Sequence, residues 1–154
     1  MSKDTSISDE HITNTGSYPD LSRVSLSAFQ YDALDHTTDS IRVLDLLPGA
    51  EDSAIQCNLR HTNTSCYSGG GYMCLSYTWQ PEKPRQDIEV NGCVLSVGQN
   101  LFQFLQAYRR YQVTEKASPL WIDAICINQS DLVEKGHQVP VSYTHLTLPT
   151  ILRV

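Results

Sequence analysis

Two apolar runs of the sequence end in residues that could bind a ligand. Ser76, Tyr77 and Trp79 close the run Tyr72-Met-Cys-Leu-Ser-Tyr-Thr-Trp, and Asp123 lies inside Leu120-Trp-Ile-Asp-Ala-Ile-Cys-Ile. In open α/β sheets, ligands bind beyond the carboxyl ends of the strands. If the two runs are neighbouring strands, their ends line one crevice whose rings and polar groups suit a ribose or a base. The predicted pocket contains Ser76, Tyr77, Trp79, Asp123, Asn128 and Gln129, with Glu134 on the helix that opens behind it.

Several of these residues also have purely structural interpretations. An unpaired carboxylate in an apolar setting is costly, so Asp123 could bond only to backbone amides of the adjoining loop. Glu134 could serve only as a helix cap. Trp79 and Trp121 could belong to the core, where large aromatic residues are usually found.

The sequence predicts neither a metal site nor a reactive thiol. Cys126 has apolar neighbours and no adjacent His, which argues against a nucleophilic thiolate. A metal site built from Cys57, His61, Cys66 and Cys74 would lack the paired short spacings of zinc modules. With five cysteines the chain has no even disulfide framework, so we expect reduced thiols.

The elements that must position these residues follow from hydrophobic patterning. We expect strands at residues 41–47, 72–79 and 120–127, and a hairpin at residues 87–97 that turns at Asn91-Gly92. An amphipathic helix begins at Asn100 as its cap, and a second helix begins at Asp131, with Glu134 reaching back in a capping box. Residues 50–71 are interpreted as a connection. The predicted fold is α/β, with a mainly parallel sheet, flanking helices and a β-hairpin insertion.

Chain length and net charge limit the number of domains and the classes of binding partner that we expect. The 154 residues suit one domain, and a net charge of −6 gives no general attraction to nucleic acid or anionic membrane. No stretch is long and apolar enough for a membrane span or a secretory signal, so we expect a cytoplasmic protein. We predict that residues 1–27 are disordered, that residues 28–139 are the domain and that residues 140–154 are a non-native tail, because Pro140 interrupts the last helix and no helical period follows it.

Four blocks, in this order, resemble the heterokaryon-incompatibility (HET) domain of filamentous fungi. They are Tyr72-Met-Cys-Leu-Ser-Tyr-Thr-Trp, Ile88-Glu-Val-Asn-Gly, Asn100-Leu101, and the highly specific Leu120-Trp-Ile-Asp-Ala-Ile-Cys-Ile-Asn-Gln-Ser-Asp-Leu-Val-Glu-Lys-Gly-His-Gln-Val. The similarity covers about residues 31–139, because residues 41–49 resemble the segment that commonly precedes the domain. The resemblance implies nonself recognition in which the domain triggers programmed cell death through self-association and protein partners.

The same resemblance suggests an alternative enzymatic function. HET domains have been likened to Toll/interleukin-receptor (TIR) domains, some of which cleave NAD at the nicotinamide bond with a glutamate. By that analogy Glu134 is the candidate catalytic residue of an NAD glycohydrolase, NAD is a substrate, and no resident cofactor is assigned. Fold-level analogy alone is weak support for chemistry.

The sequence departs from the family pattern in two places. Gln80 stands where the family usually has Gly, and the family's helix continues past Gln138-Val139 through residues that this chain lacks. The chain therefore resembles the first part of a HET domain. We expect it to be poorly active and marginally folded, with Trp121 and Ile125 uncovered at an incomplete sheet.

Overall fold

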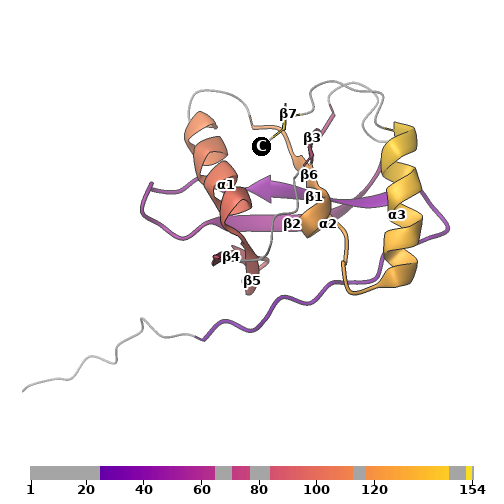
Figure 1. The fold of residues 1–154 in the computed structure, drawn as a ribbon, viewed down its shortest axis with the longest axis horizontal. Coiled ribbons are helices and arrows are strands. Elements are labelled where there is room, and N and C mark those ends of the chain that lie inside the picture. The colour runs from indigo at the N-terminus through magenta and orange to yellow at the C-terminus, as the bar shows by residue number, and fades with distance from the viewer. Residues whose placement is uncertain (1–24, 65–70, 77–83, 113–116, 146–151, 154) are drawn as a thin grey trace, which may run out of the picture.

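The computed structural model describes residues 25–64, 71–76, 84–112, 117–145 and 152–153. Most of the segment predicted to be disordered, residues 1–24, lies outside the described residues. The elements form an α/β fold, as predicted, in which helices at both ends of the view flank one sheet (Figure 1). In chain order they are β1 (Ser40–Leu46), β2 (Gln56–Asn63), β3 (Met73–Ser76), β4 (Arg85–Val90), β5 (Cys93–Gly98), α1 (Gln99–Tyr111), β6 (Leu120–Ile122), α2 (Asp123–Cys126), α3 (Leu132–His145) and β7 (Leu152–Arg153).

The sheet is mixed, so the prediction of a mainly parallel sheet is not confirmed. Its strand order is β5-β4-β2-β1-β6-β3-β7. The pairs β1–β2, β1–β6 and β4–β5 are antiparallel, whereas β2–β4, β3–β6 and β3–β7 are parallel. The longest ladder joins β1 to β2 over the whole length of β1, which makes an antiparallel pair the centre of the sheet.

Strand β2 is an element that sequence patterning does not predict, because residues 50–71 are interpreted as a connection. Only Cys57 and Leu59 are buried in it, and they alternate with exposed polar residues. Such a polar strand has low intrinsic β propensity. Its conformation is determined by backbone pairing with β1 on one side and β4 on the other.

The predicted hairpin is confirmed. Strands β4 and β5 pair antiparallel up to Val90 and Cys93, which leaves two residues for the turn. Asn91 and Gly92 have φ angles of 50° and 76°. Positive φ at both central positions is what a type I′ turn requires, and Asn-Gly is its preferred sequence.

Helix α1 covers β4 and β5 with its apolar face. Leu101, Leu105 and Tyr108 are buried, in agreement with the predicted spacing. The predicted cap is wrong: the helix begins at Gln99 with Gly98 in the N-cap position, and no side chain caps it. The apolar face thus positions this helix without the polar cap that Asn100 was expected to provide.

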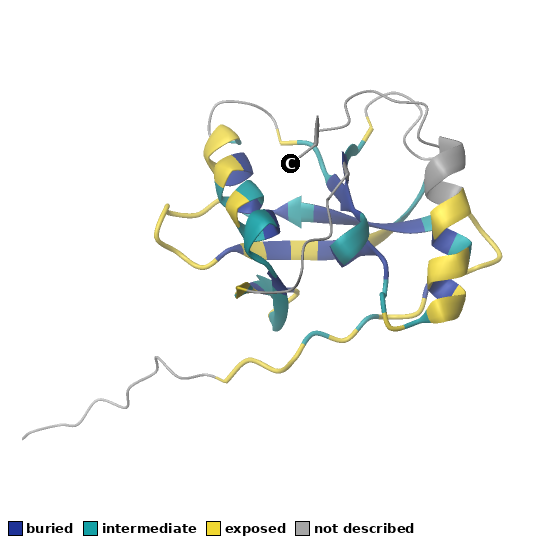
Figure 2. Ribbon diagram, in the orientation of Figure 1, coloured by how far each residue is buried: buried dark blue, intermediate teal, exposed yellow. Residues whose placement is uncertain are grey.

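The third predicted strand is shorter than expected. Strand β6 ends at Ile122, and Asp123 begins the helical turn α2 instead of continuing the strand. Trp121 is only 7% exposed and Ile125 is fully buried, so the prediction that they are uncovered is wrong. Figure 2 shows buried residues, in dark blue, along the central strands of the sheet. The apolar run is explained by a strand followed by a packed turn, both inside the core.

Helix α3 continues through Pro140 to His145, which contradicts the expectation that Pro140 ends it. Proline lacks the N–H of an internal helical hydrogen bond, so the helix loses one bond there and nevertheless continues. The non-native origin expected for residues 140–154 stays a prediction. Among the helices that the structure describes, none is long and apolar enough to cross a membrane.

Candidate functional site

The two strands that carry the predicted pocket are neighbours, as the sequence interpretation required. Strand β3 pairs parallel with β6, and Leu75 lies opposite Ile122. Ser76 is the last residue of β3 and Asp123 directly follows β6, so the two lie at the same edge of the sheet. Tyr77, Trp79 and Gln80 lie outside the described residues. Of the two predicted strand ends, the structure thus places Ser76 and Asp123 at the same edge.

Asp123 and Gln129 lie together at this edge and are joined through the backbone. The Asp123 carboxylate accepts a hydrogen bond from the backbone N–H of Ala124 at 2.7 Å, and Asp123 is half-buried. The Gln129 side-chain amide donates to the Asp123 carbonyl at 2.9 Å. These contacts stabilise the α2 turn and the loop that follows it.

Glu134 is only 2% exposed and is held by two donor groups. The Arg42 guanidinium donates to its Oε1 at 2.5 Å and to its Oε2 at 3.0 Å, which is a bidentate ion pair. The backbone N–H of Asn128 also donates to Oε1 at 2.7 Å. Glu134 therefore connects α3 to strand β1 and to the loop after α2.

Only one half of the capping box predicted at the start of α3 is present. The Asp131 carboxylate accepts hydrogen bonds from the backbone N–H groups of Val133 and Glu134, each at 3.0 Å. In a reciprocal capping box, Glu134 would accept from the Asp131 N–H, but that N–H donates to the Asn128 carbonyl instead. Glu134 reaches three residues further back, to Asn128.

Arg42 is the residue at the centre of this network, and sequence reasoning missed it. Besides Glu134, its guanidinium donates to the Cys126 carbonyl at 3.1 Å and to the Asp32 carbonyl at 2.5 Å. The Tyr31 ring lies 5.0 Å from the guanidinium carbon, in cation–π contact. One side chain thus joins the N-terminal segment, β1, α2 and α3. The available signal was a charged residue in a strand whose neighbouring residues are almost all apolar.

The charge of Glu134 is stabilised inside the protein. Burial alone would raise the pKa of its carboxyl, but the hydrogen bonds from Arg42 and Asn128 and the Arg42 charge outweigh burial and hold that pKa below its ordinary value. Burial raises the pKa of the nearby Tyr31 hydroxyl to about 12, and this hydroxyl donates to the Ile125 carbonyl at 2.8 Å. Glu134 is therefore ionised and Tyr31 neutral near pH 7.

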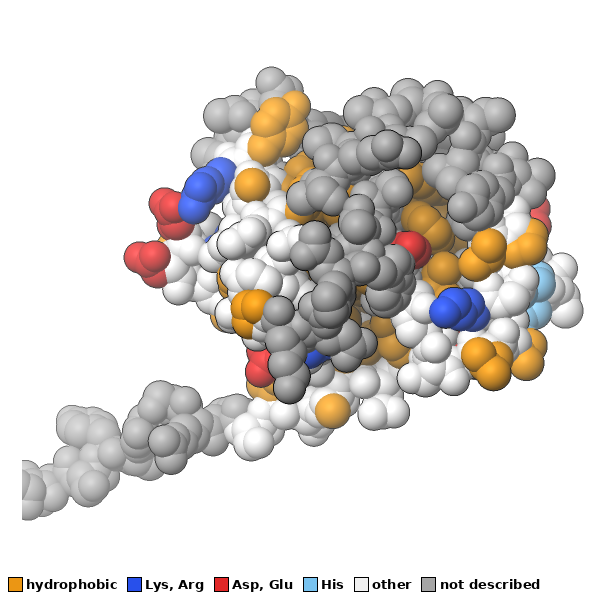
Figure 3. Space-filling view, in the orientation of Figure 1, with side chains coloured by type: hydrophobic (Ala, Val, Ile, Leu, Met, Phe, Trp, Pro, Cys, Tyr) orange, Lys and Arg blue, Asp and Glu red, His pale blue; other side chains and the backbone are white. Residues whose placement is uncertain are grey.

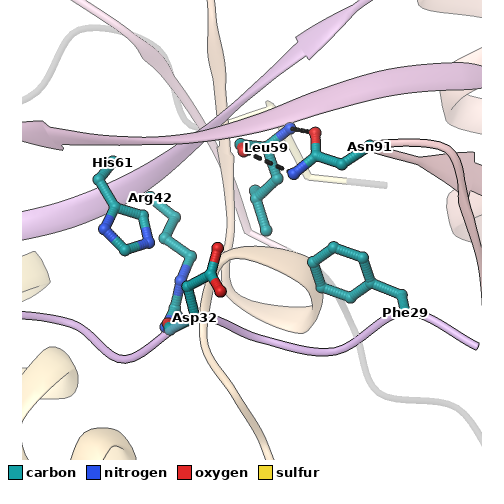
Figure 4. Close-up of a pocket in the computed structure, with 6 residues that line it drawn as sticks. All are labelled: Phe29, Asp32, Arg42, Leu59, His61 and Asn91. Atoms are coloured by element: carbon teal, nitrogen blue, oxygen red, sulfur yellow. Dashed lines mark hydrogen bonds between the residues drawn. The ribbon is translucent and has the colours of Figure 1, made fainter.

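A pocket of about 250 Å³ opens on the other side of Arg42, between the N-terminal segment and the sheet (Figure 4). The Asn91 amide at its rim is already engaged, because it donates to the Leu59 carbonyl and accepts from the Leu59 N–H, both at 2.9 Å. This pocket shares no residue with the predicted crevice, although Arg42, which lines it, is the ion-pair partner of Glu134. Its lining is Phe29, Asp32, Arg42, Leu59, His61 and Asn91.

The described part of the chain shows no metal-binding arrangement, since no three of its His, Cys, Asp or Glu residues are grouped to hold an ion. Two of its thiols, Cys57 and Cys126, are buried. Burial raises the pKa of Cys57 and of Cys126 to about 12, and both lie in the core. Neither thiol is therefore ionised near pH 7.

The block at residues 120–139 forms β6, α2 and the first part of α3, and it lies inside the part of the chain that matches a known family. The family described as heterokaryon incompatibility protein (HET) matches residues 72–142, and the chain is therefore a HET-domain protein over that part. A curated relative is heterokaryon incompatibility protein 6, OR allele, of Neurospora crassa, which is 33% identical over 124 residues. The match covers 72% of this chain and 18% of the relative, so the chain spans less than a fifth of that protein. No solved structure matches the chain.

Proposed function

We propose that this chain is a signalling module of fungal heterokaryon incompatibility, which triggers programmed cell death on nonself recognition. It acts in the cytoplasm through self-association and protein partners, without catalysis of its own. The family match and the similarity to an incompatibility protein support the biological role. The observation that favours a non-enzymatic module is the state of Glu134.

Glu134 is built into the fold as a structural carboxylate. It is 2% exposed, and both of its oxygens accept hydrogen bonds from Arg42. A carboxylate that stabilises positive charge on a ribose during nicotinamide release must contact the substrate. The Arg42 guanidinium already donates to both oxygens of this carboxylate. This geometry supports a structural role for Glu134, and it argues against the alternative in which Glu134 is the catalytic residue of a TIR-like NAD glycohydrolase.

The two functions can be separated with a variant that keeps the fold and removes the carboxylate. Replacing both members of a buried ion pair by apolar residues of similar volume is often neutral for stability, whereas removing one member is not. We therefore suggest expressing the full chain, and the double variant Arg42→Met with Glu134→Leu, from an inducible promoter in a filamentous fungus. Cell death is followed by uptake of a vital dye and NAD by enzymatic assay of extracts.

A signalling module predicts that both proteins kill equally at equal abundance and that NAD does not fall before the cells die. The matched control is Glu51→Gln, which removes the charge from an exposed glutamate that pairs with Arg110. If NAD falls first, and the double variant abolishes both the fall and the death, the module is an enzyme that uses Glu134. If the wild-type chain fails to kill at any abundance, the proposed signalling function is wrong for this chain.

A further inference from the structure

The pocket between the N-terminal segment and the sheet contains polar groups that the described part of the fold leaves unused. Neither the Asp32 carboxylate nor the His61 imidazole forms a hydrogen bond or an ion pair with a residue that the structure describes. Arg42 also lines this pocket. Its two terminal nitrogens donate to Glu134 and to the Cys126 and Asp32 carbonyls, whereas its buried Nε–H has no partner among the described residues. A ligand in the pocket would therefore meet both an acceptor and donors.

The remaining walls of the pocket offer an apolar surface. The Phe29 ring and the Leu59 side chain line it. In Figure 4 the Asp32 carboxylate lies between the Arg42 side chain and the Phe29 ring. Ligand sites combine such apolar walls with a few convergent polar groups, and sites for drug-sized molecules have volumes of about 300–1,000 Å³. At about 250 Å³ this pocket suits one small planar ligand, such as a single heterocyclic base.

The charges around the pocket favour a ligand that is not an anion. The charge of Arg42 is balanced by its bidentate ion pair with Glu134. The Asp32 carboxylate has no such partner in the described part of the chain, so it gives the pocket a net negative charge. Among the described residues on the face shown in Figure 3, Lys and Arg side chains are scattered singly and form no basic patch. A phosphate or a carboxylate would therefore meet repulsion in this pocket.

We propose that this pocket binds a guanine-type nucleobase. Guanine carries two neighbouring N–H donors, N1–H and the N2 amino group, which match the two oxygens of the Asp32 carboxylate. Its O6 and N7 atoms are acceptors, which match the Arg42 Nε–H and an N–H of the His61 imidazole. The Phe29 ring supplies a stacking surface for the base. This proposal goes beyond the signalling function proposed above and does not depend on it.

A base bound in this pocket would connect the N-terminal segment to the sheet. Phe29 and Asp32 belong to that segment, whereas His61 belongs to β2. The segment also pairs with β5 at an isolated bridge, where the Phe29 N–H donates to the Val94 carbonyl and the Val94 N–H donates to the Ser27 carbonyl, both at 2.8 Å. A bound base should slow the opening of this pairing, because it holds the same segment at a second place.

The test is a titration of the full chain with guanosine, with adenosine as the matched ligand. Both nucleosides stack and carry the same ribose, but adenine has an acceptor at N1 and an amino group at C6, the reverse of the guanine pattern. We expect guanosine to bind with a dissociation constant below about 1 mM in isothermal titration calorimetry. Adenosine should bind at least about tenfold more weakly, because a site built for hydrogen bonds rejects a ligand that leaves them unmade.

A pair of charge variants assigns the binding to this pocket. Asp32→Asn removes the carboxylate and should weaken guanosine binding at least about tenfold. The matched control is Asp52→Asn, which removes the charge of an exposed aspartate that does not line the pocket. The control should bind guanosine as the wild type does, and thermal melts should show that both variants are folded.

Hydrogen exchange of the wild-type chain locates the ligand without a substitution. Guanosine should slow the exchange of the Phe29 and Val94 N–H groups, and adenosine at the same concentration should not. The proposal is overturned if guanosine does not bind up to about 1 mM, if adenosine binds equally well, or if Asp32→Asn leaves the guanosine affinity unchanged. Unchanged exchange at both amides when guanosine is bound would place the ligand elsewhere and would also overturn it.

Discussion

Replacing Glu134 by alanine removes one half of the buried ion pair and should cost about 3–5 kcal/mol of unfolding free energy. The partner that remains is Arg42, which is 1% exposed and cannot be solvated in place. It keeps the Cys126 and Asp32 carbonyls as acceptors but loses both carboxylate oxygens. Because a domain of this size has a total stability of roughly 5–15 kcal/mol, this loss would leave little margin.

The measurement is equilibrium unfolding in urea, followed by tryptophan fluorescence, to which Trp121, 7% exposed in the fold, contributes. The matched control is Glu51→Ala. Both side chains of the Glu51–Arg110 ion pair are exposed, so its loss should lower the unfolding free energy by only about 0–1 kcal/mol. Adding Arg42→Met to Glu134→Leu should restore most of the stability, because the unpaired buried charge is then removed as well.

The reasoning fails in either of two cases. If Glu134→Ala lowers stability by no more than the exposed control, water reaches Arg42 and the ion pair is not buried in solution. If the apolar double variant is as unstable as Glu134→Ala, the loss comes from packing or from the hydrogen bond to the Asn128 N–H, and the unpaired charge is not its cause.

Two further predictions concern acid and the hairpin. The folded-state pKa of Glu134 lies below its ordinary value of 4.5, so the unfolded chain binds more protons than the folded one between these two pH values. The contribution of Glu134 to folding stability is therefore complete above pH 4.5 and is lost as the pH falls through the folded-state pKa. In urea titrations below pH 5, Glu134→Gln should therefore show a shallower decline than wild type, and equal slopes would contradict this. Gly92→Ala places a Cβ at φ 76° and should lower the melting midpoint by an amount equivalent to about 1–2 kcal/mol, whereas an unchanged midpoint would show that the turn relaxes.

Much of the local structure could be predicted from residue patterns. The hairpin was predictable because Asn91-Gly92 tolerates positive φ, and α1 because apolar residues recur with the helical period. The end of β6 was not, because an apolar run reads equally well as a strand or as a packed turn. The neighbouring β3 and β6 were correctly expected, and they place Ser76 and Asp123 at one edge.

Elements whose signals are local follow from the residue pattern, as does the specific block at residues 120–139. That Glu134 is a buried partner of Arg42 is a consequence of tertiary packing, since 92 residues separate the two. The same holds for β2, whose polar residues form a strand because two neighbours supply its backbone hydrogen bonds. A helical period shows which residues share a face, but it does not show which face turns inward. In α3 a cation on β1 decides this, because burying Arg42 requires a carboxylate beside it.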